Sequence, residues 1–172
     1  MCVPSQKRCI ELLRQTGCSE KVINHCKAVR NIAVKMAKKS GADIDLVQAG
    51  ALLHDIGRSE THGIFHAVKG ARIAKKLGLP ESIINIIERH IGAGLSKEEA
   101  KKLGLPEKEY IPITLEEKIV CHADSLIADN KRQKIEKQVE TALIDGHKEY
   151  AVRLVNLHKE LSDICGMDVN LI

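Results

Sequence analysis

Apolar residues recur at intervals of three and four along most of the chain, and runs that alternate apolar with polar residues are scarce. This spacing gathers apolar side chains on one face of a helix, whereas a half-buried strand would need a period of two. We therefore predict an all-α fold. Serine, threonine and aspartate favour helix N-caps, and glycine favours the position after a last turn, so these residues divide the pattern into separate helices.

The cap and stop signals predict nine helices. Their approximate ranges are 5–15, 19–40, 43–55, 65–78, 80–92, 96–104 and 114–128, with two more in 131–172 that are broken near 145–146. Pro80 suits the first turn of its helix. Ser96 with Glu99, and Thr114 with Glu117, have the spacing of a capping box, in which each side chain bonds the backbone of the other residue.

Length and composition are typical of one helical domain. A chain of 172 residues with 44% hydrophobic residues can bury a sizeable core. We expect a single domain over 1–172, with a core at about 19–130 and a C-terminal helical extension at 131–172 that covers the core or contacts a partner. No apolar run approaches the roughly 20 residues of a membrane span and no leader pattern opens the chain, so we expect a cytoplasmic protein without a membrane segment.

Charge and aromatic content limit which classes of ligand the chain can bind, and cysteine spacing indicates the state of its thiols. The net charge of +4 is modestly basic and suits an anionic small molecule. Stacking of unpaired bases needs several aromatic side chains, but only 2% of the residues are aromatic, so we do not expect sequence-specific binding of nucleic acid. The six cysteines form no CxxC pair and are expected to be reduced thiols.

Metal-ligand residues lie on the apolar faces of five predicted helices. They are His25, His54, Asp55, His66, His90 and Asp124. A lone histidine on such a face is most often a hydrogen-bonded core residue. Five such faces in one small domain instead favour a shared metal site, because burying ionisable groups without compensation is expensive. Six ligands exceed one closed tetrahedral site, so two ions that share a carboxylate fit better.

The order of these residues resembles the signature of the HD-domain superfamily over about Val22–Ala128, and His54-Asp55-Ile56-Gly57 resembles its HDIG subgroup. The resemblance implies an HD-domain helical bundle with ligands from five helices. It implies one ion held by His25, His54, Asp55 and Asp124. It implies a second ion held by Asp55 as a bridge, His66 and His90. We expect two divalent ions, Fe or Mn first, with Zn, Ni, Co or Mg also compatible.

The common activity of this family is hydrolysis of phosphate esters or anhydrides, mostly of nucleotides. Paired ions lower the pKa of a bound water, and cationic side chains stabilise the phosphoryl oxygens. We expect His54, Asp55 and Arg58 to be catalytic, and Arg58, Lys69 and His62 to contact the substrate. The expected partner is a phosphorylated small molecule, in particular a nucleotide, and a homodimer is left open.

The other three histidines are expected outside the ligand set. His122 is expected to support the site through a hydrogen bond, and His147 and His158 to lie on the surface.

Two other functions remain open at this point. HD proteins of the myo-inositol oxygenase and phosphonate-cleaving type use a similar six-ligand site for a mixed-valent di-iron centre, and ligand spacing does not separate them from hydrolases. The chain could also be a binding module with an inactive site. Among the hydrolases, Ile91 stands where HD-GYP phosphodiesterases have a second histidine, and no GYP motif follows. The stretch before Asp124 is more similar to HD hydrolases of dinucleoside polyphosphates.

Overall fold

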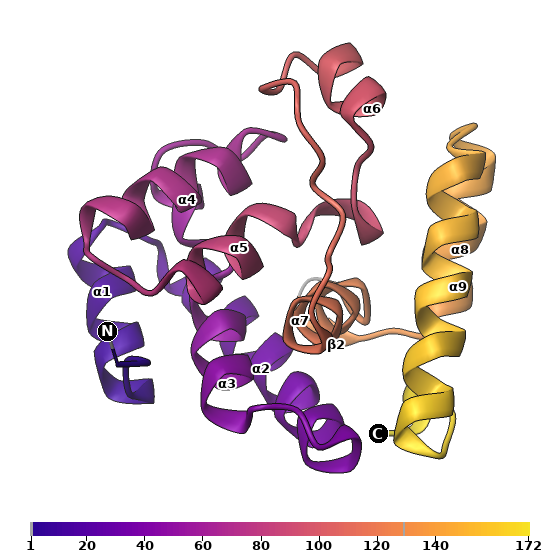
Figure 1. The fold of residues 1–172 in the computed structure, drawn as a ribbon, viewed down its shortest axis with the longest axis horizontal. Helices are drawn as coiled ribbons and strands as arrows, with labels where there is room; N and C mark the ends of the chain where they lie inside the picture. The colour runs from indigo at the N-terminus through magenta and orange to yellow at the C-terminus, as the bar shows by residue number, and fades with distance from the viewer. Residues whose placement is uncertain (1, 129) are drawn as a thin grey trace.

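The computed structural model describes residues 2–128 and 130–172, and within them the fold is almost entirely helical (Figure 1). The helices are α1 (Gln6–Gln15), α2 (Glu20–Ser40), α3 (Ile44–Leu53), α4 (His66–Lys76), α5 (Glu81–Arg89), α6 (Lys97–Lys102), α7 (Leu115–Ser125), α8 (Ile135–Ile144) and α9 (Lys148–Cys165). Short 3-10 turns are η1 (Ile56–Ser59), η2 (Ile91–Ala93) and η3 (Val169–Leu171), and the strands are β1 (Ile127–Ala128) and β2 (Lys131–Arg132). The all-α prediction is confirmed. None of the described helices has both the length and the hydropathy of a membrane span.

Helix boundaries follow the predicted capping residues. The side chains of Ser19 and Asp43 each accept a hydrogen bond from the backbone N–H three residues later, which begins α2 and α3. Gly41 ends α2 with a φ of 75°, a left-handed conformation that glycine adopts without steric cost. Ser96 and Glu99 form both hydrogen bonds of the predicted capping box. Local sequence therefore explains where most helices begin and end.

The second predicted capping box is only half formed, so that prediction is wrong. Thr114 accepts a hydrogen bond from the Glu117 backbone. The Glu117 carboxylate instead accepts from the backbone N–H of Ile113 at 2.7 Å and from the Arg89 guanidinium at 3.0 Å. Glu117 is buried, and pairing with Arg89 compensates its charge there. This ion pair joins α7 to the end of α5.

The helix expected to reach residue 128 ends earlier, at Ser125, and this boundary was wrong. The chain turns at Leu126 and forms an antiparallel hairpin that pairs Ile127 with Arg132. Asn130 lies in the turn with a φ of 63°, a conformation that asparagine tolerates better than most residues. Helix α7 thus ends before the hairpin, and Asn130 is suited to the turn that reverses the chain.

Helix α3 lies at the centre of the packing. Nearly all of its residues after Val47 are buried, so it is apolar on every side, as a fully enclosed helix must be. It packs against α1, α2, α5 and α7. Buried residues form two large clusters that share α3: one draws on α1, α2, α4 and α5, and the other on α2, α7, α8 and α9. The C-terminal end of α3 is therefore held from several directions.

A close backbone contact joins the turn after α3 to helix α4. A Cβ atom added to Gly57 would lie 1.9 Å from the carbonyl oxygen of His66 and 2.5 Å from the nitrogen of Gly70. A Cβ atom added to Gly70 would lie 2.8 Å from a methyl carbon of Ile87. Only glycine permits this approach, which brings the start of α4 against the end of α3.

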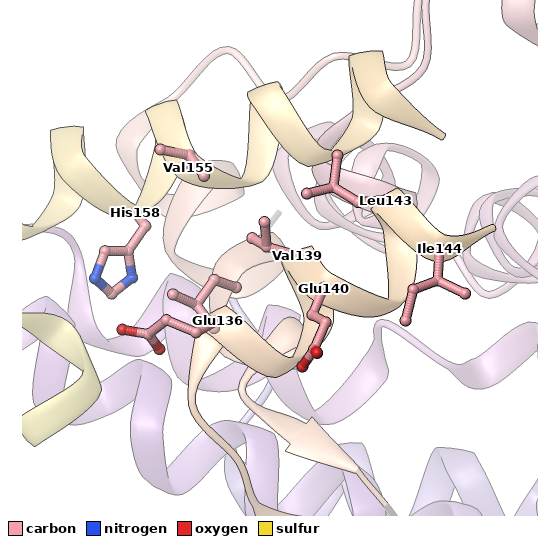
Figure 2. Close-up of a pocket in the computed structure, with 8 residues that line it drawn as sticks. Glu136, Val139, Glu140, Leu143, Ile144, Val155 and His158 are labelled. Carbon is pink, nitrogen blue, oxygen red and sulfur yellow. The ribbon is translucent and has the colours of Figure 1, made fainter. Parts of the chain in front are cut away.

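The α8–α9 hairpin covers the second cluster and has an apolar groove on its own surface (Figure 2). One face of α9 packs against α2 and α7. The groove has a volume of about 460 Å³ and is lined by Ile135, Glu136, Val139, Glu140, Leu143, Ile144, Val155 and His158. Of the six predicted metal ligands, none lines it.

A histidine pair links α7 to α9. His122 is fully buried, and its Nε2 lies 3.1 Å from Nδ1 of His158, whose Nε2 in turn lies 3.1 Å from the Asp168 carboxylate. The His158 side chain is half-buried, 17% exposed, at the edge of the surface groove on the α8–α9 hairpin, and His147 is exposed. Burial, followed by the nearby His158, lowers the pKa of His122 to about 3.

We expect Gly57→Ala to lower the free energy of unfolding by about 3 kcal/mol, the upper end of the usual cost of overpacking, because the obstructing atoms are backbone. Urea denaturation would measure it. Gly63→Ala is the matched control, since its new Cβ would meet nothing closer than Thr61 Oγ1 at 4.0 Å. An unchanged urea midpoint for Gly57→Ala would contradict the close contact.

We also expect His122 to make stability fall in acid. Its pKa is about 3 when folded and near 6.5 when unfolded, so between these values the unfolded chain binds a proton that the folded chain does not. Stability from the neutral imidazole is therefore present above pH 6.5 and is lost as pH falls, by about 2 kcal/mol between pH 7 and 5. His122→Gln should show a correspondingly shallower fall in urea titrations at these pH values. If the free energy of unfolding fell equally with pH in both proteins, His122 would not be the group that causes the loss of stability.

Candidate metal centre

The six predicted ligand residues come together where helices end or begin. They are His25 in α2, His54 at the end of α3, Asp55 in the following turn, His66 at the start of α4, His90 at the end of α5 and Asp124 in the last turn of α7. His54, Asp55, His66 and His90 are buried, whereas the side chains of His25 and Asp124 are 20% and 28% exposed. The open side of the cluster is therefore formed by α2 and α7.

Four of these side chains form the first half of the cluster. Nε2 of His25 lies 2.8 Å from Oδ1 of Asp124 and 3.8 Å from Oδ2 of Asp55. Nε2 of His54 lies 3.5 Å from the same oxygen of Asp124 and 3.7 Å from the same oxygen of Asp55. Two imidazole nitrogens and two carboxylate oxygens thus face a common point.

The second half of the cluster uses the other oxygen of Asp55. Oδ1 lies 3.2 Å from Nε2 of His66 and 3.6 Å from Nε2 of His90, and these two nitrogens are 2.9 Å apart. The ligand atoms of these three residues all lie within 4.8 Å of one another. Asp55 therefore presents one carboxylate oxygen to each half, which is the orientation that a bridging carboxylate needs.

Backbone hydrogen bonds orient three of the imidazoles. Nδ1 of His54, His66 and His90 each lies within 2.8 Å of the carbonyl oxygen of the residue three positions earlier. A carbonyl only accepts, so each Nδ1 carries the proton and donates it. The lone pair of each neutral ring is then on Nε2, the atom that faces Asp55.

Two atoms at the centre of the cluster test whether a metal ion fits. Nε2 of His54 and Oδ1 of Asp55 are buried and, within the described part of the chain, have no aligned hydrogen-bond partner. The 3.2 Å approach of His66 to Asp55 is close but poorly directed. An unsatisfied buried polar group costs about 1–3 kcal/mol. A divalent cation in each half of the cluster would satisfy one of these atoms, and imidazole with carboxylate is a donor set that suits Fe, Mn or Zn.

The charges within the cluster favour ionised carboxylates. Burial resists ionisation of Asp55 and Asp124, but the neighbouring histidines hold the pKa of both carboxyl groups well below the usual range. Burial likewise opposes protonation of His54, yet the two carboxylates raise its pKa well above its ordinary value. Burial lowers the pKa of His90. A cation in the cluster would compete with a proton for His54.

A cleft of about 350 Å³ opens onto this cluster. It is lined by Ser19, Lys21, Val22, His25, Asp55, Arg58, His62 and Asn130. Nε of Arg58 donates to Oδ2 of Asp55 at 2.5 Å, and its Nη1 donates to the His62 carbonyl at 3.3 Å. Two of the predicted substrate-contact residues, Arg58 and His62, therefore lie at the cleft.

The other predicted contact, Lys69, does not line this cleft. Its Nζ lies 3.5 Å from Glu60, which also pairs with Arg72. Sequence reasoning had not considered Lys21 and Asn130, which do line it. Lys21 was detectable, because it precedes His25 by four residues and so shares its face of α2. Asn130 was not detectable from the sequence, because its position at the cleft depends on how the β1–β2 hairpin folds back.

The family comparison agrees with this geometry. Residues 22–129 match the family model of the HD domain, which is more than half of the chain. Among solved structures, the HD domain of the L. monocytogenes phosphodiesterase PgpH matches with a TM-score of 0.57 and 21% identity, covering 92% of this chain and 97% of that domain. The same domain in complex with cyclic-di-AMP matches equally well, with a TM-score of 0.57. At this level of identity the likeness shows a shared fold.

Sequence relatives carry different names. A tRNA (cytidine(56)-2'-O)-methyltransferase of Thermoplasma volcanium is 48% identical over 98% of this chain, but the chain spans only 50% of that protein's length. An uncharacterized protein of Methanocaldococcus jannaschii is 50% identical, over 86% of this chain and 91% of its own length. Ribonuclease Y of Aquifex aeolicus is 34% identical over 69% of this chain and 19% of its own length. With its family model matched over residues 22–129, this chain belongs to the HD-domain family.

Proposed function

We propose that this chain is a metal-dependent phosphohydrolase that cleaves a phosphate ester or anhydride of a nucleotide. The observation that carries the proposal is the position of Asp55, whose two carboxylate oxygens face two separate groups of histidines at the floor of a cleft with cationic walls. Paired ions, when bound, would lower the pKa of a water molecule toward neutrality and offset charge on the phosphoryl oxygens. Fe and Mn are the metals that we expect first.

Each ligand residue has a place in this proposal. The first ion would be held by His25, His54, Asp55 and Asp124. The second would be held by Asp55, His66 and His90. Since Nδ1 of three of these histidines is already bonded to the backbone, their Nε2 atoms are oriented before any ion arrives.

Arg58 has two roles in the proposed reaction. Its bond to Asp55 orients that carboxylate, and the rest of its guanidinium lines the cleft, where a phosphate would lie. A planar guanidinium can donate two parallel hydrogen bonds to phosphate oxygens. We infer that Arg58 holds the scissile phosphate and offsets the charge that develops on it during cleavage.

The names of the relatives fit this proposal when their lengths are considered. The methyltransferase relative is twice as long as its match to this chain, so we assign methyl transfer to its other half. The Methanocaldococcus relative matches over nearly its whole length and so corresponds to this unit by itself. Ribonuclease Y is named for cleavage of RNA, and its match with this chain supports a nucleotide phosphoester as the substrate class.

We expect purified chain to bind about two divalent ions, and Asp55→Ala and His54→Ala to lose most of them while keeping their helical content. The reason is that Asp55 faces both halves of the cluster and His54 contributes to the first. Metal analysis after loading with Mn or Fe, alongside circular dichroism, would test this. His147→Ala removes an exposed histidine away from the cluster and should bind as the wild type does. Full metal binding by Asp55→Ala would remove the basis for the site.

We further expect hydrolysis of bis(p-nitrophenyl) phosphate by the Mn- or Fe-loaded chain under nitrogen, and its loss on chelation. Arg58→Ala should lower kcat/KM by about 100-fold, as removal of one donor to a developing charge usually does, without changing the metal content. Arg58→Lys should recover only part of this, since an ammonium cannot form the paired bonds. Turnover that requires oxygen, with no phosphoester cleaved, would instead favour the di-iron oxygenase.

A further inference from the structure

The cleft extends beyond the groups that the proposed hydrolysis uses. Arg58, His25 and Asp55 account for its floor and one wall. Its remaining polar lining consists of Ser19, Lys21, His62 and Asn130. Ser19 and Lys21 lie at the start of α2, and Asn130 lies in the β1–β2 turn, so residues distant in sequence form this part together.

Lys21 is available for a ligand. Within the described chain, Lys69, Lys97, Lys101, Lys108 and Lys118 each lie within 4.0 Å of a carboxylate. Lys21 forms no such ion pair among the described residues, although it lines the cleft. It lies one helical turn before His25, so its ammonium group is attached on the side of α2 that faces the cluster. A cation in this position attracts an anion bound next to the metal ions.

The neighbouring polar groups can complete an anion site. The Ser19 hydroxyl oxygen accepts a hydrogen bond from the Val22 backbone, so its own O–H remains able to donate. The Asn130 side chain carries two N–H donors. Together with the ammonium group these are donors of the kind that bind phosphate oxygens. The cleft volume of about 350 Å³ lies near the lower end for small-ligand sites, which suits a single nucleotide unit.

We propose that Lys21, assisted by Ser19 and Asn130, binds a second phosphate group adjacent to the one that is cleaved. This inference rests on the proposed function and makes its substrate class narrower: the preferred substrates carry at least two phosphates in succession. The second phosphate can belong to an oligonucleotide backbone or to a polyphosphate chain. Lys21 is then a specificity-determining residue, because it acts only on substrates that have this group.

The test compares substrates that differ only in the second phosphate. The dinucleotide UpU has one phosphate, while pUpU and UpUp have a second at either end, and AMP with ADP makes the same comparison for the polyphosphate source. We expect the wild type to cleave pUpU or UpUp with kcat/KM at least tenfold higher than UpU. Lys21→Ala should remove that advantage, and Lys21→Glu should reverse it, with the metal content unchanged. For UpU and bis(p-nitrophenyl) phosphate, which lack the second phosphate, Lys21→Ala should lower kcat/KM by at least fivefold less than it does for pUpU or UpUp.

Lys35→Ala is the matched control, since Lys35 is exposed on the same helix but lies fourteen residues further along, about 20 Å from Lys21. An equal effect of Lys21→Ala on every substrate, or no effect on any, would overturn the proposal. A dependence on Lys21 seen with ADP alone would support it and assign the second phosphate to a polyphosphate chain.

A binding measurement separates this inference from the proposed hydrolysis. Labelled UpU, pUpU and UpUp can be titrated into the chelated chain, in which the proposed metal-dependent hydrolysis does not occur. If the wild type cleaves nothing but binds pUpU or UpUp at least tenfold more tightly than UpU, and Lys21→Ala abolishes the difference, the phosphate site stands and hydrolysis fails. If hydrolysis is observed but the three ligands bind Lys21→Ala and wild type alike, the phosphate site fails and hydrolysis stands.

Discussion

The contact between the backbones of Gly57 and Gly70 is the constraint on which the candidate site depends. It sets how closely the turn after α3 approaches α4, because no side chain separates the two segments. With this spacing, His66 at the start of α4 reaches to within 3.2 Å of Asp55. A wider separation would leave Asp55 facing only the His25 and His54 side of the cluster. The glycine of the His-Asp-Ile-Gly run therefore determines whether Asp55 faces one group of histidines or both.

A second requirement of the candidate site is that its imidazole rings are correctly oriented, and the helix ends provide this orientation. The last carbonyls of a helix lack partners within it, and they need donors from elsewhere. At the ends of α3 and α5, Nδ1 of His54 and of His90 provides such a donor. The same hydrogen bond satisfies a backbone carbonyl and places the lone pair of the ring on Nε2. Placing a histidine at a helix end thus stabilises the helix and prepares a metal ligand together.

The sequence was sufficient to predict features that depend on nearby residues. Ser19 begins α2 and Gly41 ends it, and both effects act within one helical turn. The inward positions of the candidate ligands likewise follow from helical periodicity. The failures involve distant partners. Glu117 could have bonded back to Thr114, but Arg89 from another helix competes for it. Asn130 lines the cleft only because the β1–β2 hairpin folds back toward α2, which periodicity within one helix does not reveal.

The polar centre also carries a cost for the fold that a metal ion would reverse. Helix α3 is enclosed by apolar residues, yet it ends in His54 and Asp55, two buried ionisable groups whose facing atoms lack aligned partners in the described chain. Their desolvation opposes folding, since buried polar groups are stable only when they are paired. An ion that binds the folded arrangement and not the unfolded chain adds its binding free energy to the stability of the fold. A metal ion bound at this centre would therefore add to the stability of the fold through the same groups that would serve its chemistry.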